Sequence, residues 1–464
     1  MLNVLFPIVT APYISRVLGV ENVGTVRFVT IFVGYLVLLA AFGIGTYGVR
    51  ELAKYKNDQE KCSRIFSSLF FITLCSTFVV TLLFILGINF IPELREYRLL
   101  FAIFGITLYL VPISMDWYFQ AKENFRMIAI RSFVVRMLAI ASLFIFVRER
   151  GDVVPYILIS AFAIVVTHIW NFCYAYKGGL RIRLRHLELR RHIKAMFVFL
   201  WIGIAAGIYT MIDVVMLGFL SSHEQIGFYT SSNMIVLAVM GLFFAMNTVL
   251  LPRISFDNAQ NGESNPMLLQ KAFDLKVLLV VPMALGLCLI ASRFVPLFFG
   301  GEFLGSIAPL QILSLKMIVM AISSFFAHNM LVAVGHEKKV LFAVIIASFI
   351  SLVLSFLLIP HFGAIGSATV RVVVECFNLG LNLFFVYTLT KTRVQWKSIG
   401  TAVAFVLPFF AIYYLCAKFF PHNVVFLLVF VCLSSVVYFA LQLWQKNYLV
   451  QQAVETVLIK LKNK

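Results

Sequence analysis

The chain has 464 residues, of which 62% are hydrophobic and 12% are charged, and its formal net charge is +18. Because soluble proteins carry about 25% charged residues, this composition excludes a soluble globular protein. Apolar runs of about 20 residues recur along the chain, which predicts a helical protein that crosses a membrane many times. In such a protein the excess of basic residues lies in cytoplasmic loops that face anionic lipid, so we expect no nucleic-acid partner.

The apolar runs are separated by charged segments or by turns that contain glycine and proline, and they predict fourteen transmembrane helices. No separate signal peptide is visible, so the first run is interpreted as an uncleaved span. The expected spans are residues 1–18, 24–45, 65–87, 98–119, 127–147, 154–176, 195–220, 228–251, 273–292, 306–333, 340–359, 363–388, 399–417 and 423–442.

The charges of the loops predict the orientation of these spans. If the N-terminus is cytoplasmic, the inward segments contain 26 Lys and Arg residues and the outward segments contain 5. Positive residues favour the cytoplasmic side, so we expect both termini in the cytoplasm and the protein in a bacterial inner membrane. The inward segments are residues 46–64, 120–131, 177–194, 252–272, 334–339, 389–398 and 443–464.

Two equal spacings indicate an internal repeat. Gly24 and Arg50 are 26 residues apart, as are Gly227 and Arg253, so the copies are offset by 203 residues. Six expected spans separate the copies, and an even number keeps their orientation, as in transporters built from parallel repeats. We therefore predict an all-α membrane protein with two pseudo-symmetric lobes around a central cavity. The expected domains are an N-terminal lobe (1–194), a C-terminal lobe (195–388) and two further spans with a basic tail (389–464).

Ionisable side chains inside the expected spans are the candidates for function. Each costs roughly 2.5–3.5 kcal/mol in the middle of a membrane helix, so it normally faces a cavity or a partner. Seven of the ten candidates are cationic, and a cavity rich in guanidinium groups suits the oxygens of a phosphate. The candidates inside the spans are Arg16, Arg27, Asp116, Arg136, Asp213, Lys316, Arg371 and Glu375, and Arg50 and Arg253 join them at cytoplasmic helix ends.

Each candidate also has a structural interpretation. The arginines near helix ends could extend to lipid headgroups, and Arg371 and Glu375, four residues apart on one helix, could neutralise each other. Burial of Asp213 would favour its protonated form, which makes it a candidate proton or sodium site, and Lys316 could pair with it instead. The seven cysteines show no CxxC pair and no His/Cys ligand spacing, so we expect no metal site and no cofactor.

Six segments carry motifs of a known family. They are residues 6–19 with Gly24, and residues 42–54, 116–126, 209–218, 227–229 and 251–253. These segments resemble flippases for O-antigen and capsule repeat units, which belong to the multidrug/oligosaccharidyl-lipid/polysaccharide exporter superfamily. One departure is the short first span, because members of the family usually begin several residues earlier; we expect either a late start codon or a genuine difference.

The resemblance implies alternating-access transport of an undecaprenyl-diphosphate-linked oligosaccharide across the cytoplasmic membrane. The implied partners are this lipid, the bilayer, a polysaccharide polymerase and a chain-length regulator. Arginines at matching positions of related lipid II flippases line a cationic cavity, and here that role would fall to Arg16, Arg27, Arg50 and Arg253. Lys316 and Arg371 are further candidates for binding the diphosphate. The candidates for coupling to an ion gradient are Asp213, Glu375 and Asp116.

Other classes of function remain open at this point. A multidrug cation antiporter of the same superfamily should meet its cationic drugs with acids, whereas the candidates here are mainly basic. A membrane glycosyltransferase, either a polymerase or a ligase, generally holds its catalytic residues in a large outer loop. The longest expected outer loop, residues 293–305, carries one acid, Glu302, and we expect no catalytic residues and no enzyme activity. A passive structural protein would not need the charges inside its spans.

Overall fold

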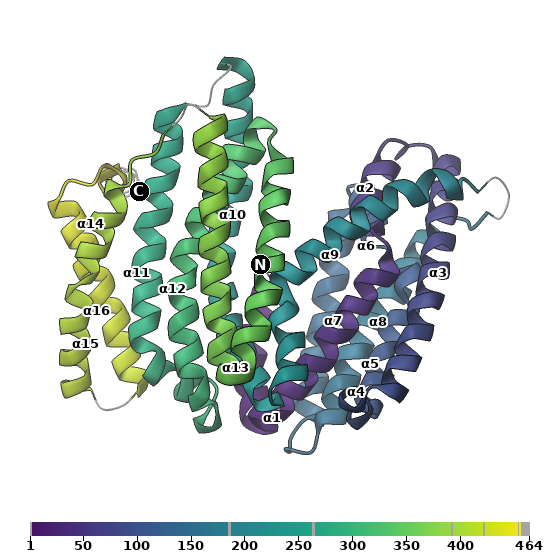
Figure 1. Ribbon diagram of the computed structural model, residues 1–464, viewed down its shortest axis with the longest axis horizontal. Helices are drawn as coiled ribbons and strands as arrows, with labels where there is room; N and C mark the ends of the chain where they lie inside the picture. Colours follow the sequence, from purple (N-terminus) through teal and green to yellow (C-terminus); the bar gives the residue numbers. More distant parts are fainter. Residues whose placement is uncertain are drawn as a thin grey trace, which may run out of the picture. The chain divides into compact units, whose positions relative to one another are not determined.

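The computed structural model describes residues 2–183, 187–261, 265–390, 393–420, 423–452 and 454–455, and these residues are almost entirely helical (Figure 1). No β-strand occurs within these ranges. The helices up to the middle of the chain are α1 (Leu2–Ala41), α2 (Ile44–Ala53), α3 (Gln59–Phe90), α4 (Pro92–Glu96), α5 (Arg98–Tyr109), α6 (Asp116–Ala121), α7 (Phe125–Phe146), α8 (Val153–Lys177) and α9 (Leu189–Leu220). The remaining helices are α10 (His223–Asn261), α11 (Pro266–Phe298), α12 (Ile307–Ser324), α13 (Glu337–Leu389), α14 (Lys397–Val406), α15 (Pro408–Phe419) and α16 (Asn423–Trp444).

The apolar helices confirm the predicted class of an all-α polytopic membrane protein. Within the described residues, eleven helical segments are long and apolar enough to span a membrane, or twelve if the bent pair of residues 98–109 and 111–121 is one span. Two of these segments contain a break in the helical backbone, at Gly19 in α1 and at Gly363 in α13. Each broken segment holds two of the expected spans, which accounts for the predicted number of about fourteen. Gly19 has a φ of 77°, a conformation that glycine adopts without steric cost.

The chain forms two compact units, residues 1–227 and 228–464. In the first unit, α1 packs against α3, α5 and α9, and α7 packs against α8. In the second unit, α12 packs between α11 and α13, while α14 and α16 pack on α11. The division therefore follows Gly227 and not the expected boundary after residue 194, because α9 packs on α1, α2 and α3.

The basic connector before α9 is held against the first turns of α3. The backbone N–H of Arg183 donates to the hydroxyl of Ser67 (2.8 Å), and that of Glu188 donates to the hydroxyl of Ser68 (3.1 Å). The Arg183 side chain also forms an ion pair with Glu60 (2.8 Å). Residues 184–186 of this loop lie outside the described residues. The polar side chains at the start of α3 thus bind the backbone of a loop that the sequence suggested would contact lipid headgroups.

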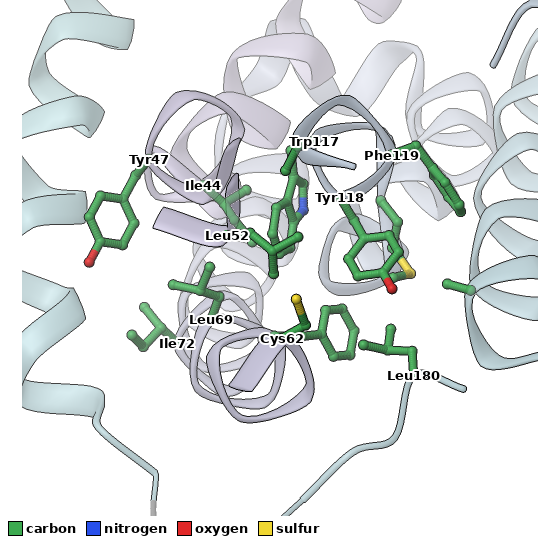
Figure 2. Packing of buried hydrophobic residues seen from close by; sticks show 14 of the residues in the cluster. Ile44, Tyr47, Leu52, Cys62, Leu69, Ile72, Trp117, Tyr118, Phe119 and Leu180 are labelled. Carbon is green, nitrogen blue, oxygen red and sulfur yellow. The ribbon is translucent and has the colours of Figure 1, made fainter. Parts of the chain in front are cut away.

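An apolar cluster packs α2, α3, α6 and the start of α9 together in the first unit (Figure 2). Trp117 of α6 stacks on Phe66 of α3 and lies against Gly48 of α2, where a Cβ atom would come within 2.5 Å of the indole ring. The position of α2 is therefore set by close packing on an aromatic side chain, which only a glycine permits here. The hydroxyl of Tyr47 points away from this cluster and contacts the Nδ1 atom of His192 in α9 (2.7 Å).

Candidate functional site

Arg50 lies on the exposed side of α2 and rests on aromatic rings. Its guanidinium carbon is 5.0 Å from the ring centroid of Phe199 in α9 and 5.7 Å from that of Tyr47. A guanidinium stacked in this way keeps its N–H donors available at the edge of its plane. The sequence places Arg50 at a helix end, and the packing of α2 on α9 supplies the aromatic support that the sequence did not predict.

The other arginines predicted to bind the diphosphate are also accessible. Arg16 on α1 and Arg253 on α10 are exposed, and Arg27 on α1 is partly exposed. Arg253 follows Pro252, which lies inside the continuous helix α10. The exposure of these guanidinium groups is compatible with both interpretations, which are contact with lipid headgroups and binding of an anionic substrate.

Asp116, a predicted coupling residue, takes part in a polar cluster of the first unit. Its carboxylate accepts a hydrogen bond from Arg131 of α7 (2.6 Å) and one from the amide of Asn171 in α8 (2.9 Å). The Arg131 side chain is 4% exposed, whereas that of Asp116 is 50% exposed. The acid therefore compensates a buried arginine that the sequence had assigned to an inward loop.

The remaining residues predicted to bind the diphosphate or to couple transport are buried inside their units, whereas Arg136 on α7 is partly exposed. Asp213 is enclosed on α9 of the first unit, and Arg371 and Glu375 are enclosed on α13 of the second. Lys316 of α12 is also buried, and its ammonium donates to the side-chain oxygen of Asn233 in α10 (3.4 Å). The structure thus separates the predicted set into accessible arginines and buried groups.

A polar network continues along the face of α13 that carries Arg371 and Glu375. Asn378 and Asn382 follow at helical spacing, and both amide groups donate to the hydroxyl of Ser323 in α12 (3.2 Å each). All of these side chains are buried. Because buried polar groups are costly in an apolar protein, this row of them distinguishes the α12–α13 contact from the apolar packing around it.

Lys276 of α11 is a buried cation that the sequence analysis did not single out. Its ammonium donates to the side-chain oxygens of Asn247 in α10 and Asn329 (3.3 Å), and it lies 5.2 Å from the ring centroid of Phe325. Both Phe325 and Asn329 belong to a π-helical stretch, residues 325–331, a rare form that is frequent at functional sites. Among the described residues, no carboxylate lies within ion-pair distance of this ammonium. The asparagines inside two apolar spans were the signal that could have revealed it.

Comparisons with known proteins identify the family. The family model for polysaccharide biosynthesis protein matches residues 1–256. A protein of Escherichia coli (strain K12) named "Putative O-antigen transporter" is 26% identical over 387 residues, covering 83% of this chain and 93% of its own length. A Shigella dysenteriae protein of the same name is 23% identical over 371 residues, covering 78% and 91%. These similarities confirm the family that the sequence motifs indicated.

Solved structures share the fold at low sequence identity. A lipid II flippase, MurJ, in an inward closed conformation has a TM-score of 0.79 at 17% identity, covering 96% of this chain and 97% of that one. An inward-facing multidrug resistance transporter of the MATE family has a TM-score of 0.65 at 15% identity, covering 83% and 93%. The family model spans more than half of the sequence. The chain is therefore a polytopic membrane protein that belongs to the polysaccharide biosynthesis protein family.

Proposed function

We propose that the protein is a flippase that carries an undecaprenyl-diphosphate-linked oligosaccharide repeat unit across the inner membrane of a bacterium. Membership of the polysaccharide biosynthesis protein family and two relatives named as O-antigen transporters support this class of passenger. The fold similarity to a lipid II flippase supports movement of a lipid between leaflets. On this proposal both termini are cytoplasmic, and the exported unit passes to a polymerase and a chain-length regulator.

The observation that carries the proposal is the accessible guanidinium of Arg50, held on the rings of Phe199 and Tyr47. A diphosphate cannot cross hydrocarbon unaided, because its charges lose their hydration. Guanidinium groups replace that hydration with paired hydrogen bonds to phosphate oxygens. Arg16, Arg27 and Arg253 are the further residues that we assign to this role, while the prenyl chain stays in the surrounding lipid.

The main alternative is a multidrug cation antiporter, since a transporter of that kind shares the fold. The accessible candidates are arginines, which repel a cationic drug and attract a phosphate. The curated relatives are named for O-antigen and not for drugs. Charge and relatives therefore both favour the lipid-linked passenger.

Coupling to a proton or sodium gradient is a second part of the proposal. Asp213 and Glu375 are the preferred candidates because both are carboxylates enclosed in a membrane protein. Asp116 is the weakest of the three candidates, since its carboxylate is already held by Arg131 and Asn171. Alternating access between two lobes would let one of these acids exchange its ion on opposite sides of the membrane.

Deletion of the gene, followed by extraction of lipid-linked intermediates, tests this function. We expect complete oligosaccharide units on undecaprenyl diphosphate to accumulate in the inner leaflet, and a plasmid copy of the gene to remove them. Accumulation of complete units in the outer leaflet would instead indicate a polymerase or a ligase. Normal surface polysaccharide together with increased sensitivity to cationic drugs would indicate the multidrug antiporter.

A further inference from the structure

A pocket with polar and apolar walls lies at one end of the second unit. Its volume is about 500 Å³, and it is enclosed by the start of α11, by residues 395–402 around the start of α14, and by residues 442–448 after α16. These three segments belong to, or directly adjoin, parts of the chain that the loop charges assign to the cytoplasmic side. None of the residues predicted to bind the diphosphate lines this pocket.

The pocket carries an excess of positive charge. Lys271, Lys397 and Lys446 line it and are exposed, and among the described residues no carboxylate is within ion-pair distance of their ammonium groups. The acid in the lining, Asp274, accepts hydrogen bonds from Gln270 (2.7 Å) and from the Tyr448 hydroxyl (2.9 Å). Burial raises the pKa of Tyr448, so its hydroxyl stays a donor to Asp274. The three ammonium groups are therefore left to face the pocket without a neutralising acid.

The start of α14 adds the backbone N–H groups of Lys397 and Ser398 to the same pocket, whereas the N–H of Ile399 already donates to the carbonyl of Trp396. The capping residue Trp396 makes no side-chain hydrogen bond to the first turn, so the first backbone N–H groups of the helix lack a side-chain acceptor. The hydroxyl of Ser398, which lines the pocket, is shielded from solvent and has no hydrogen-bond partner among the described residues. Helix N-termini with free donors favour anions.

The pocket lies at the level where spans begin and end. The apolar segments that meet it start at Lys397 and stop at Trp444, so it sits at the border between water and hydrocarbon. Trp444 is 80% exposed beside it, as expected of an indole ring at a membrane surface. Leu278 and Ala402 contribute apolar walls, whereas the lysines and glutamines contribute polar ones. This combination fits an amphipathic ligand and not a soluble ion.

We propose that this pocket binds the phosphate headgroup of an anionic glycerophospholipid from the cytoplasmic leaflet. The ammonium groups of Lys271, Lys397 and Lys446 surround the phosphate, and the Ser398 hydroxyl and the first N–H groups of α14 donate to its oxygens. The glycerol and the first acyl carbons lie against Leu278 and Ala402. Such a lipid would join α11, α14 and α16 at the cytoplasmic surface.

The test uses the full chain in phosphatidylcholine vesicles that contain a trace of photoactivatable phosphatidylglycerol or, separately, photoactivatable phosphatidylcholine. Mass spectrometry then maps the cross-linked peptides. We expect phosphatidylglycerol to label residues 266–278, 395–402 and 442–448 in preference to phosphatidylcholine. The combined variant Lys271→Gln, Lys397→Gln and Lys446→Gln should remove this preference. Each lost charge should lower the ratio of phosphatidylglycerol labelling to phosphatidylcholine labelling about five-fold. Ser398→Ala alone should reduce the preference of the otherwise unchanged chain without changing its net charge.

A variant with the same loss of charge elsewhere is the control. Lys177→Gln, Lys194→Gln and Lys338→Gln remove three exposed lysines on the same expected side, outside the pocket, and should leave the labelling unchanged. Equal labelling by the two lipids, or wild-type labelling of the triple pocket variant, would overturn the proposal. Loss of labelling on addition of inorganic phosphate would also overturn it, because the ligand would then be a free anion. The labelling does not depend on transport. A negative result would therefore contradict the lipid-binding proposal and leave the proposed flippase function unaffected.

Discussion

Gly24 and Gly227 lie backbone against backbone through reciprocal contacts. A Cβ atom on Gly24 would come within 1.8 Å of the carbonyl oxygen of His223, and one on Gly227 within 2.3 Å of the carbonyl oxygen of Val20. The offset of 203 residues relates Val20 to His223 as it relates Gly24 to Gly227. Gly24 and Gly227 therefore make equivalent contacts, as expected of matching positions in the predicted repeat.

This contact predicts a large effect of a small substitution. Gly24→Ala should lower the stability by at least about 2 kcal/mol, because the added methyl group meets backbone atoms that cannot rotate away. Gly34→Ala is the matched control on the same helix, since nothing lies within 4 Å of its Cβ position. The apparent unfolding temperature in detergent is the measurement. Equal temperatures for the two variants would contradict the close contact.

The Asp116–Arg131 pair predicts a coupled effect on stability. Asp116→Asn should destabilise the protein by about 2–3 kcal/mol, because it leaves the buried guanidinium of Arg131 undercompensated, and the half-exposed acid keeps the cost below that of a fully buried pair. In the Arg131→Met background the same change should cost much less. A double-mutant cycle measured by thermal unfolding checks this. Additive losses would show that the two side chains do not act together.

Lys276 and its hydrogen-bond partner Asn247 are predicted to differ in how their substitution changes the stability, because only Lys276 carries a buried charge. Lys276→Met should keep or raise the unfolding temperature, because methionine fills a similar volume without a buried charge. Asn247→Leu should lower the stability by about 2–3 kcal/mol, since it removes an acceptor from that charge. Combining both changes should restore most of the loss. If Asn247→Leu lowers the stability equally in the wild type and in the Lys276→Met background, this explanation is wrong.

The membrane spans were predictable from the sequence because about 20 apolar residues are needed to cross a bilayer and few other structures use such runs. The sequence did not predict that the connections between adjacent spans at Gly19 and Gly363 would be this short. Each is a single break inside an otherwise continuous helix, where expected loops were residues 19–23 and 360–362. A glycine with a positive φ can break the helix at a single residue. The pattern of apolar residues does not show where such a break occurs.

The buried cations near span ends were not predictable from apolar runs alone. Lys276 lies four residues into the expected span that starts at residue 273, and Arg131 was counted in an inward loop, so both resembled residues at the membrane surface. In the structure α11 already begins at Pro266 and α7 at Phe125, which places both cations well inside their helices. Their partners come from other helices, and sequence spacing does not reveal such contacts.

Asp213 predicts how transport depends on the ion gradient. Asp213→Asn keeps the size of the side chain but removes the ionisable group, so we expect export to persist at a lower rate and to lose its response to the gradient. Glu302→Gln is the control, because this exposed acid lies at the expected outer surface. Export of surface polysaccharide is measured with and without a protonophore or a sodium ionophore. An unchanged response in Asp213→Asn would exclude this residue from coupling.

The central claim is that accessible arginines carry a diphosphate-linked oligosaccharide across the membrane. The most direct measurement reconstitutes the purified chain in vesicles and follows the transfer of undecaprenyl-diphosphate oligosaccharide to the opposite leaflet with an impermeant glycosidase. We predict transfer by the wild type and by Lys61→Ala, an exposed charge on α3, and no transfer by Arg50→Ala or Arg253→Ala that still inserts and folds. Transfer by both arginine variants at the wild-type rate, or by empty vesicles at the rate of the wild type, would contradict the account.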